Sequence, residues 1–369
     1  MTDKLTVHEN GQPVYDIVFN NSFTGLLDAM SAMNICNRKI CIVTETTVGP
    51  IYAEGIEQIL KQSCSNVYVY TFPAGEENKT LDTVKSLYEF LIVNHFDRKD
   101  MLVALGGGVT GDLTGYTAAT YLRGIDFIQI PTSLLAQVDS SVGGKTGVDF
   151  DSYKNMVGAF YHPKLVYINT DTLKTLTKRQ FLSGMAEVVK YGLIKRRDFF
   201  DWLIENAEQI KAYDYEALKY MIYVSCDTKR VVVENDFKEQ GERALLNMGH
   251  TLGHAIEKCV NFKLLHGECV SIGSVAAAYI SQRMGYISAD DLKLVIDAHR
   301  IFDIPVSESE FDTDEVLNAT LSDKKMEAGA VKFIVLKEIG HAVIDKTISL
   351  DIMSEALIKV KSGEFEHYE

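Results

Sequence analysis

The sequence predicts an α/β protein of two parts, an α/β domain over residues 1–170 and a mainly α-helical domain over residues 171–369. In the first part, short runs of β-branched and aromatic residues alternate with helical patterns. This alternation is typical of a parallel sheet that is covered by helices on both faces. After about residue 171 the glycine and strand signals thin out, and long stretches with apolar residues at helical spacing take their place.

The first domain is expected to contain five strands, because five runs are rich in Val, Ile, Tyr and Phe. These runs are residues 39–44, 66–72, 101–105, 127–130 and 165–168. Helices are expected at residues 52–62 and 80–94. In the second of these helices, Leu81, Val84, Leu87, Tyr88 and Leu91 recur close to the spacing of one helical face.

The second domain is expected to be built from six helices, with a short pair of strands near its end. The helices are residues 178–191, 198–213, 215–235, 249–259, 268–284 and 289–302, and the strands are residues 332–336 and 341–344. The most apolar stretch, Cys269 to Ile280, is bracketed by Glu268 and Arg283 and predicts a buried helix. It is too short for the roughly 18 apolar residues of a membrane helix.

Length and composition limit the function classes. A chain of 369 residues with 46% hydrophobic and 24% charged residues is ordinary for two globular domains. The net charge of −14 disfavours binding to nucleic acids or to an anionic membrane surface. The amino terminus lacks the basic and apolar regions of a secretory signal, and the six cysteines contain no C-x-x-C pair. We therefore expect reduced thiols and a cytoplasmic location.

A glycine-rich segment follows the third expected strand and opens a helix. Gly106, Gly108 and Gly111 satisfy the pattern G-x-G-x-x-G, which lets backbone N–H groups approach a pyrophosphate. The pattern is weak by itself, and it usually follows the first strand of a dinucleotide-binding fold. A tight strand–helix turn that needs glycine torsions is the other interpretation.

A second segment, Gly143-Gly144-Lys145-Thr146, is similar to a P-loop but does not meet its requirements. That motif needs a glycine at the position of Asp139. Lys145 remains a candidate ligand for a phosphate or carboxylate, and a solvated loop lysine is the alternative.

Histidines and a carboxylate form a candidate metal site. His250 and His254 are four residues apart and would share one helical face. The pair lacks the glutamate of H-E-x-x-H, which disfavours a metalloprotease. Glu187 lies in an otherwise apolar helical stretch, where a carboxylate needs a cationic partner. Together with His250 and His266 it would make a two-histidine, one-carboxylate site typical of catalytic zinc. An ordinary buried Glu–Lys pair beside two capped helices is equally open.

Several basic and amide side chains adjoin these motifs. Each one alone is most simply a solvated surface group. As a set they would suit a substrate that carries both phosphate and carboxylate groups. They are Lys145, Lys154, Lys190, Lys229, Arg243, Asn155 and Asn247.

These motifs together resemble 3-dehydroquinate synthase, of the sugar phosphate cyclase superfamily. The resemblance runs in order and at family spacing from about residue 40 to residue 340. It is carried by GGGVTGD at 106–112, YLRG at 121–124, PTSLLAQVDSSVGGKT at 131–146, KN at 154–155, AEVVKYG at 186–192, LNMGHTLGHA at 246–255 and HGE at 266–268.

The resemblance implies a Rossmann-like NAD-binding domain, a helical metal- and substrate-binding domain, one divalent ion (zinc or cobalt) and a cytoplasmic homodimer. It implies a lyase that converts 3-deoxy-D-arabino-heptulosonate 7-phosphate to 3-dehydroquinate and phosphate. The family reaction combines transient oxidation by NAD, β-elimination of phosphate, reduction and intramolecular aldol closure, and it is the second step of the shikimate pathway to chorismate and the aromatic amino acids.

The resemblance also assigns residues to roles. The metal ligands would be Glu187, His250 and His266. The catalytic set would be Lys145, Lys190, Lys229, Arg243, Asn247, His254 as a candidate proton-transfer group, and Glu239 as a second acid or base. Further substrate contacts would come from Asp139, Asn155, Lys324 or its neighbour Lys325, and Arg123, the last reaching in from a partner subunit. The NAD contacts would be Glu45, Thr47, Gly75, Glu76, Lys79, Gly107, Gly108, Val109, Asp112, Thr132, Ser133, Lys154, Thr172 and Thr175.

Two departures from the family pattern concern the adenosine end of the cofactor. The family usually has aspartate where Glu45 stands and often asparagine where Thr47 stands. These differences bear on cofactor affinity, because they remove no chemical group that the reaction needs.

Three rival interpretations remain. A sister cyclase would act on sedoheptulose 7-phosphate or glucose 6-phosphate, which lack the carboxylate. The presence of Lys229, Arg243, Asn247 and His254 favours the substrate that carries it. A polyol dehydrogenase of the same superfamily would show net NADH production. A catalytically silent scaffold is disfavoured by the presence of Glu187, His250, His266, Lys145 and Lys190, and absence of both bound metal and NAD affinity would favour it again.

Overall fold

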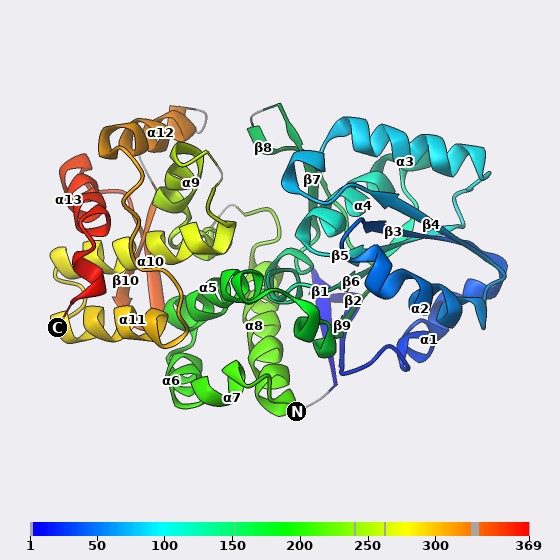
Figure 1. Cartoon of the computed structure of the whole chain (residues 1–369), viewed down its shortest axis with the longest axis horizontal. Helices are drawn as coiled ribbons and strands as arrows, with labels where there is room; N and C mark the ends of the chain where they lie inside the picture. The colour runs from blue at the N-terminus through cyan, green and yellow to red at the C-terminus, as the bar shows by residue number, and fades with distance from the viewer. Residues whose placement is uncertain (1–2, 152, 240, 262, 326–331, 369) are drawn as a thin grey trace. The chain divides into compact units, whose positions relative to one another are not determined.

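The chain forms two compact units, which are described separately here, Met1–Leu176 and Thr177–Glu369 (Figure 1). The computed structural model describes residues 3–151, 153–239, 241–261, 263–325 and 332–368. The division follows the short 3-10 helix η6, Thr170–Thr175, rather than residue 170. This helix belongs to the first unit because Gln137 Nε2 donates to Thr172 Oγ1 at 3.0 Å.

The first unit is built on a seven-stranded sheet in the order β1-β2-β9-β6-β5-β3-β4. The five expected strands are confirmed, and every pair of neighbours among them is parallel. They are β3 (Lys39–Glu45), β4 (Asn66–Phe72), β5 (Met101–Gly106), β6 (Asp126–Pro131) and β9 (Leu165–Asn169).

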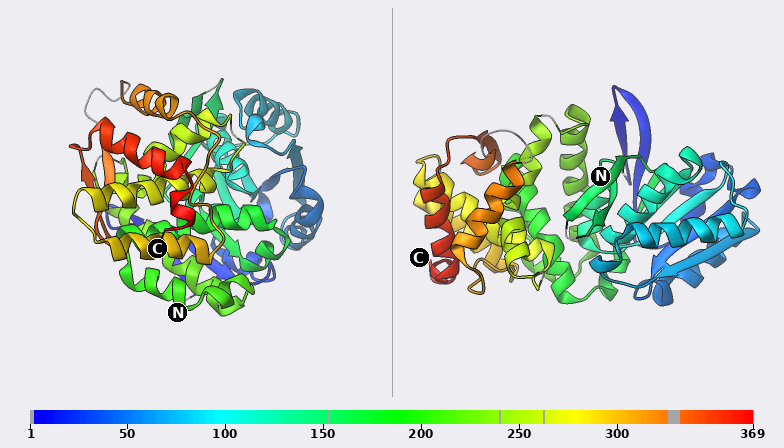
Figure 2. Two further views of the ribbon diagram at one scale, coloured as in Figure 1. Left: turned by 60° about the vertical axis from the view of Figure 1, so that its left-hand side comes forward. Right: turned by 90° about the horizontal axis from the view of Figure 1, so that it is seen from above.

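Two further strands were not expected from the sequence. They are β1 (Lys4–Glu9) and β2 (Gln12–Asn20), an antiparallel pair of which β2 runs parallel to β9. Figure 2 shows this pair as a dark-blue ribbon. In β2, Tyr15, Ile17 and Phe19 are buried and alternate with less buried residues, as in a strand with one face against the core.

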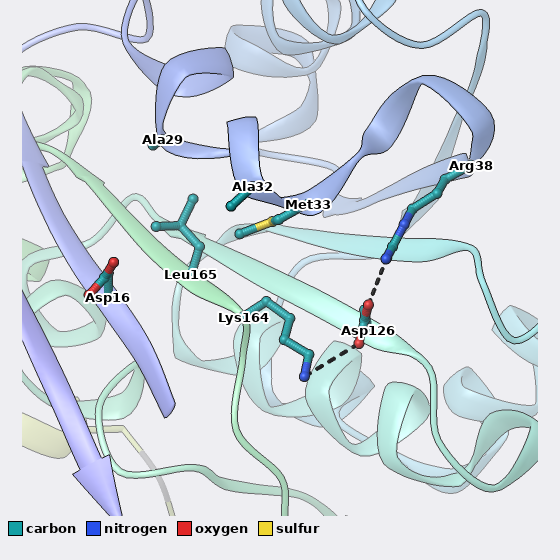
Figure 3. A pocket seen from close by; sticks show the side chains of 8 residues that line it. All are labelled: Asp16, Ala29, Ala32, Met33, Arg38, Asp126, Lys164 and Leu165. Atoms are coloured by element: carbon teal, nitrogen blue, oxygen red, sulfur yellow. Dashed lines mark hydrogen bonds and ion pairs between the residues drawn. The ribbon is translucent and has the colours of Figure 1, made fainter. Parts of the chain in front are cut away.

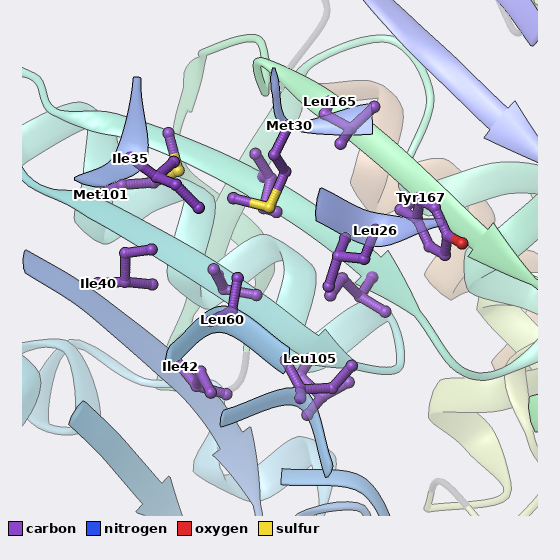
Figure 4. Packing of buried hydrophobic residues seen from close by; sticks show 14 of the residues in the cluster. Leu26, Met30, Ile35, Ile40, Ile42, Leu60, Met101, Leu105, Leu165 and Tyr167 are labelled. Carbon is purple, nitrogen blue, oxygen red and sulfur yellow. The ribbon is translucent and has the colours of Figure 1, made fainter. Parts of the chain in front are cut away.

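Both faces of the sheet are covered by helices. From β3, Ile40 and Ile42 pack against the side that carries α1 (Leu26–Ala29) and α2 (Gly49–Lys61) (Figure 4). Cys41 and Val43 point to the opposite side, which carries α3 (Leu81–Val93) and α4 (Gly108–Thr120). Burial on both faces explains why these strands are continuous apolar runs in the sequence.

A separate hairpin, β7 (Lys145–Phe150) and β8 (Tyr153–Phe160), was also unexpected. Gly147 and Gly158 lie opposite each other, and a Cβ atom on Gly147 would lie 2.8 Å from the Val157 carbonyl oxygen. The glycines that obscure the strand pattern are therefore required by close backbone approach within the pair.

The second unit is mainly helical, as expected. Its helices are α5 (Lys178–Lys195), α6 (Arg197–Glu205), α7 (Ala207–Lys211), α8 (Tyr215–Asn235), α9 (His250–Cys259), α10 (His266–Arg283), α11 (Ala289–Ile301), α12 (Thr313–Lys325) and α13 (Leu350–Lys361). The expected strand pair is confirmed as β10 (Phe333–Glu338) and β11 (His341–Asp345). The expectation of one helix over residues 198–213 was wrong, because the chain breaks it at Asn206, whose Nδ2 donates to the Trp202 carbonyl oxygen.

Helix α10 is the core of the second unit. Every residue from Cys269 to Ser281 is buried, and the helix packs against α5, α9, α11, α13 and β10. The prediction of a buried helix over the apolar stretch is therefore confirmed. Among the described residues, no helix combines the length and the apolar character needed to cross a membrane.

Candidate active site

The expected cofactor residues follow the carboxyl ends of parallel strands in the first unit. Because these strands are parallel neighbours, their ends lie at the same edge of the sheet, where ligands of open α/β folds bind. Glu45 is the last residue of β3 and Thr47 follows it. Gly75, Glu76 and Lys79 follow β4, Gly107, Gly108, Val109 and Asp112 follow β5, Thr132 and Ser133 follow β6, and Thr172 and Thr175 follow β9. The fold thus assembles at one edge a set that is spread over 131 positions of the chain.

The glycine-rich turn lies where the strand order reverses. The chain runs from β3 outward to β4 and then returns to β5 on the other side of β3. Helix α4 begins at Gly108, and a Cβ atom there would lie 3.1 Å from Ser140 Oγ, while one on Gly106 would lie 2.4 Å from Thr110 Oγ1. Close packing therefore requires glycine at this turn, and the same turn presents the amino terminus of a helix to the ligand edge. The expected need for glycine torsions is wrong, because none of the glycines from Gly106 to Gly111 has a positive φ, and it is close packing that favours glycine here. Binding of a pyrophosphate at this turn stays a prediction.

Lys79 connects the cofactor edge with the hairpin. Its Nζ lies 2.8 Å from Asp112 Oδ2 and donates to Asn155 Oδ1 at 2.6 Å. Although burial lowers the pKa of this buried lysine, the carboxylates of Asp112 and Glu76 outweigh burial and hold its pKa above the usual value. Lys79 is therefore a permanent cation, and it brings the expected substrate residue Asn155 next to expected cofactor residues.

Asp149 is a supporting residue that sequence reasoning missed. Its Oδ1 accepts from the Asn155 backbone N–H at 2.8 Å, and its own N–H donates to the Lys79 carbonyl oxygen at 2.8 Å. Asn155 has a left-handed backbone with φ of 55°, which the bond from its N–H to Asp149 supports. The available signal was the apolar and polar alternation of the hairpin, which the glycines interrupt.

Glu45 has a structural role in addition to its expected contact with the cofactor. Its carboxylate accepts from the backbone N–H groups of Thr47 and Val48, the latter at 2.8 Å. These donors precede α2, so that the carboxylate orders the start of that helix. The exposed Thr47 side chain lies beside it at the ligand edge.

In the second unit, Glu187 lies between two histidines. Its side chain is fully buried in α5, and its Oε1 is 3.5 Å from His250 Nε2 and 3.4 Å from His266 Nε2. Ligand atoms bound to one tetrahedral zinc ion lie about 3.3–3.6 Å apart. His250 and His266 are the first residues of α9 and α10, so that two helix starts present their imidazoles to one carboxylate.

The protonation of this cluster favours a bound cation. His250 Nδ1 lies 3.1 Å from the Met248 carbonyl oxygen, which can only accept, so that Nδ1 carries the hydrogen and Nε2 turns a lone pair towards Glu187. Burial, and then the charge of Lys190, lower the pKa of His250 well below its usual value and keep the ring neutral. A carboxylate oxygen facing an imidazole lone pair is a repulsive arrangement that a metal ion resolves. The residues present therefore fit a divalent metal.

The alternative of a buried Glu–Lys pair is also present in the structure. Lys190 Nζ pairs with Glu187 Oε2, while Oε1 faces the two histidines. One oxygen of the Glu187 carboxylate thus pairs with Lys190, and the other faces the candidate metal position.

His254 lies in the same cluster. Its ring centroid is 5.1 Å from that of His250 and 5.5 Å from that of His266, and ligand atoms of the three histidines lie within 4.8 Å of one another. The histidines alone would make His254 a third ligand. Glu187 is favoured because its Oε1 is within 3.5 Å of both other ligand atoms, and the exposed His254 is then available for proton transfer.

The loop between α8 and α9 brings together three of the expected catalytic residues. Arg243 is buried in the 3-10 helix η7, Glu242–Asn247, and its Nη1 donates to the Phe237 carbonyl oxygen at 2.7 Å. Asn247 Nδ2 donates to Glu239 Oε1 at 2.9 Å. Lys190 and Lys229 are buried in α5 and α8. Buried cations need polar or anionic partners, and the concentration of these side chains in one helical unit fits an anionic substrate.

The remaining expected substrate and cofactor residues lie outside the two clusters described above. Arg123 is exposed at the end of the short 3-10 helix η4, Tyr121–Arg123, with φ of 67°, and Asp139 lies in the π-helical turn η5, Ala136–Ser140. Lys145 is exposed at the start of β7, and Lys154 lies in β8. Lys324 falls within α12 at a point where the side chains, including that of Lys325, are outside the described part of the structure.

A cavity of about 290 Å³ lies elsewhere in the first unit, by the amino ends of β6 and β9. Figure 3 shows its lining residues, Asp16, Ala29, Ala32, Met33, Arg38, Asp126, Lys164 and Leu165, and none of them is an expected site residue. Arg38 Nη1 lies 2.6 Å and Lys164 Nζ 3.6 Å from the Asp126 carboxylate. The two basic and two acidic side chains of the cavity largely compensate one another, so that the cavity offers no strong site for a phosphate group.

Comparisons with known proteins agree with this geometry. Family models described as 3-dehydroquinate synthase N-terminal and C-terminal match residues 69–183 and 184–326. A 3-dehydroquinate synthase of Syntrophotalea carbinolica is 42% identical over 339 residues, which cover 92% of this chain and 93% of that protein.

Two solved structures are similar over almost the whole chain. One is a 2-epi-5-epi-valiolone synthase from Streptomyces hygroscopicus subsp. jinggangensis with NAD+ and Zn2+ bound, with a TM-score of 0.87, 26% identity and coverage of 94% of this chain and 97% of that chain. The other is a 2-deoxy-scyllo-inosose synthase in complex with carbaglucose-6-phosphate, NAD+ and Co2+, with a TM-score of 0.87, 25% identity and coverage of 96% and 99%.

Proposed function

The chain belongs to the 3-dehydroquinate synthase family, and from this premise we propose which of its residues carry out the reaction. It is an NAD- and divalent-metal-dependent lyase that converts 3-deoxy-D-arabino-heptulosonate 7-phosphate to 3-dehydroquinate and phosphate, the second step of the shikimate pathway. When bound, the NAD and the metal ion supply the transient oxidation of a substrate hydroxyl and the polarisation of its oxygen.

The observation that carries the assignment of the metal is the position of Glu187. Its Oε1 lies at ligand-to-ligand distance from both His250 and His266. These three residues would hold the ion and would leave at least one position open for substrate oxygen, as catalytic sites do. His254, exposed beside them, would move a proton at the phosphate end of the substrate.

The NAD would lie along the carboxyl edge of the sheet in the first unit. Backbone N–H groups at Gly107, Gly108 and Val109 would bind the pyrophosphate, because the start of α4 directs unpaired donors and a positive dipole end to that position. Lys79 and Asp112 would orient the cofactor as a preformed ion pair. The other contacts would come from Glu45, Thr47, Gly75, Glu76, Thr132, Ser133, Lys154, Thr172 and Thr175.

The substrate would be held by cations and amides. Arg243 suits a carboxylate because a guanidinium binds both carboxylate oxygens in one plane. The substrates of the sister cyclases have no carboxylate. Glu239 would act through Asn247, to which it is hydrogen bonded. The other contacts would come from Lys145, Lys190, Lys229, Asp139, Asn155, Lys324 and the partner subunit's Arg123. We also propose that the protein is a homodimer in the cytoplasm, as is usual in the family. Analytical ultracentrifugation would test the dimer.

The first experiment is release of phosphate from 3-deoxy-D-arabino-heptulosonate 7-phosphate by the purified protein with NAD and zinc. We expect release without net NADH production and loss of release after chelation. His266→Ala should lose bound metal and activity together, while His341→Ala, a histidine exposed on β11, should retain both. Metal retained in His266→Ala would remove this residue from the site, and release from sedoheptulose 7-phosphate alone would move the chain to the sister cyclases.

Arg243→Ala tests recognition of the carboxylate. Loss of a hydrogen bond to a charged group should raise the substrate KM about 10- to 100-fold, while the affinity for NAD stays unchanged. Arg243→Lys keeps the charge without the planar guanidinium, and its substrate KM should lie between those of the unmodified chain and Arg243→Ala. An unchanged KM in Arg243→Ala would contradict the role.

A further inference from the structure

Helix α5 and the start of α10 contact each other at three successive levels. Arg179, Ser183 and Glu187 are spaced four residues apart and therefore lie along one face of α5. They meet Glu268, Gly267 and His266, in that order, so that the α10 residues run in the reverse direction. The innermost level contains two of the three candidate metal ligands, Glu187 and His266.

The outermost level is a two-pronged ion pair. Arg179 Nε lies 2.7 Å from Glu268 Oε1, and Arg179 Nη2 lies 2.7 Å from Glu268 Oε2. Nη2 also donates to the Lys263 carbonyl oxygen at 2.9 Å, and the Leu265 N–H donates to Glu268 Oε2 at 2.7 Å. The pair therefore ties both the loop before α10 and the first turn of α10 to α5, with the geometric specificity of a bidentate contact.

At the middle level the start of α10 cannot move closer to α5. The Gly267 N–H donates to Ser183 Oγ at 3.1 Å, and a Cβ atom on Gly267 would lie 1.8 Å from the Ser183 carbonyl oxygen. The two backbones are thus in direct contact. Movement of the α10 start relative to α5 can therefore occur only by separation or rotation, which the outer ion pair opposes.

The innermost level depends on the other two. His266 is the first residue of α10, and its Nε2 lies 3.4 Å from Glu187 Oε1. Ligand atoms must be held within a few tenths of an ångström for tight binding of a metal, and groups behind the ligands commonly change affinity by about 10- to 100-fold.

We infer that Arg179 and Glu268 are positioning residues of the metal centre, which set the separation of Glu187 and His266 by clamping the first turn of α10 to α5. This inference rests on the proposed metal site. Arg179 is 55% exposed, so that the pair adds little to global stability. Its effect is expected in metal affinity.

The test measures Co2+ affinity of the full chain by chelator competition and by the absorption spectrum of the bound ion. Arg179→Met and Glu268→Gln should each weaken Co2+ binding about 10- to 100-fold, and the double variant should be no weaker than the weaker single one. Glu268→Gln keeps an oxygen that can accept from the Leu265 N–H and so isolates the loss of the ion pair. Arg179→Lys, which keeps the charge but not the fork, should also be weaker than the unmodified chain.

Arg283→Met is the matched control, because it breaks the ion pair between Arg283 and Glu355 at the far end of the same helix. Its Co2+ affinity, thermal midpoint and NAD affinity should equal those of the unmodified chain. Unchanged Co2+ affinity in both Arg179→Met and Glu268→Gln would overturn the inference. Tight Co2+ binding that survives Glu187→Ala would instead contradict the proposed metal site, so that the two failures are distinguishable.

Discussion

Lys79 Nζ donates a hydrogen bond of 2.6 Å to Asn155 Oδ1, although the two residues are 76 positions apart. This bond occupies one of the two lone pairs of the amide oxygen and fixes the orientation of the amide, so that its NH2 group points away from Lys79. Asn155 would therefore act as a donor to a phosphate, carboxylate or hydroxyl oxygen. The lysine at the cofactor edge thus orients the amide of the asparagine in the hairpin.

Lys79→Met should weaken NAD binding and lower stability together. The change leaves the partly buried Asp112 carboxylate without its ion-pair partner, and we expect a loss of about 1–3 kcal/mol in the free energy of unfolding. Urea denaturation and NAD titration would measure the two effects. Lys85→Met, at an exposed position of α3, should change neither quantity. An affinity for NAD equal to that of the unmodified chain would argue against a role for Lys79 at the cofactor.

Lys190→Met should make stability depend more strongly on metal. Lys190 and Glu187 are both buried, with side chains 2% and 0% exposed. Removal of the lysine leaves a buried carboxylate, which costs about 3–5 kcal/mol without metal. Saturating zinc should restore part of this loss, because the ion supplies positive charge at the other oxygen. The unfolding midpoint with chelator and with zinc would show it, and equal metal-induced shifts in variant and unmodified chain would disprove the prediction.

Gly267→Ala should separate α5 from α10. The added Cβ atom would overlap the Ser183 carbonyl oxygen, and overpacking of this kind costs about 1–3 kcal/mol. Metal affinity should fall as well, because His266 is the neighbouring residue. Gly55→Ala is the matched control, since a Cβ atom there meets no described atom within 4 Å, and it should stabilise α2 by about 0.5–1 kcal/mol. Equal unfolding midpoints for the two variants would contradict the close contact.

His299 should make the chain sensitive to mild acid. Burial lowers its pKa from 6.5 to about 4. Above pH 6.5 both folded and unfolded states are neutral at this residue. As the pH falls, the unfolded state takes up the proton first, so that stability declines between pH 6.5 and pH 4. From pH 7 to pH 5 the loss should be about 2 kcal/mol.

Comparison with His299→Gln isolates this contribution, because glutamine does not titrate. Urea denaturation at pH 7 and pH 5 should show a smaller loss of stability in the variant. Equal losses would show that other groups dominate the pH dependence.

The sequence predicted the central strands and most helices correctly because their signals are local. β3 and β5 are buried on both faces and so are apolar throughout. The hairpin β7–β8 was missed because glycines interrupt its alternation. In β1 and β2 the alternation of buried and less buried residues is present, but it was overlooked in the sequence. The break at Asn206 within residues 198–213 was also missed, because asparagine is tolerated within a helix and gives no strong stop signal.

The sequence by itself determined the family and the kinds of chemical group, because motif residues and their spacing are properties of the chain. Only the tertiary structure decided which groups meet. Helical spacing predicts that Arg179, Ser183 and Glu187 share a face, but packing of α5 against α10 decides that this face meets Glu268, Gly267 and His266. The physical reason is that contacts between distant segments depend on how whole helices and strands pack, which no local pattern encodes.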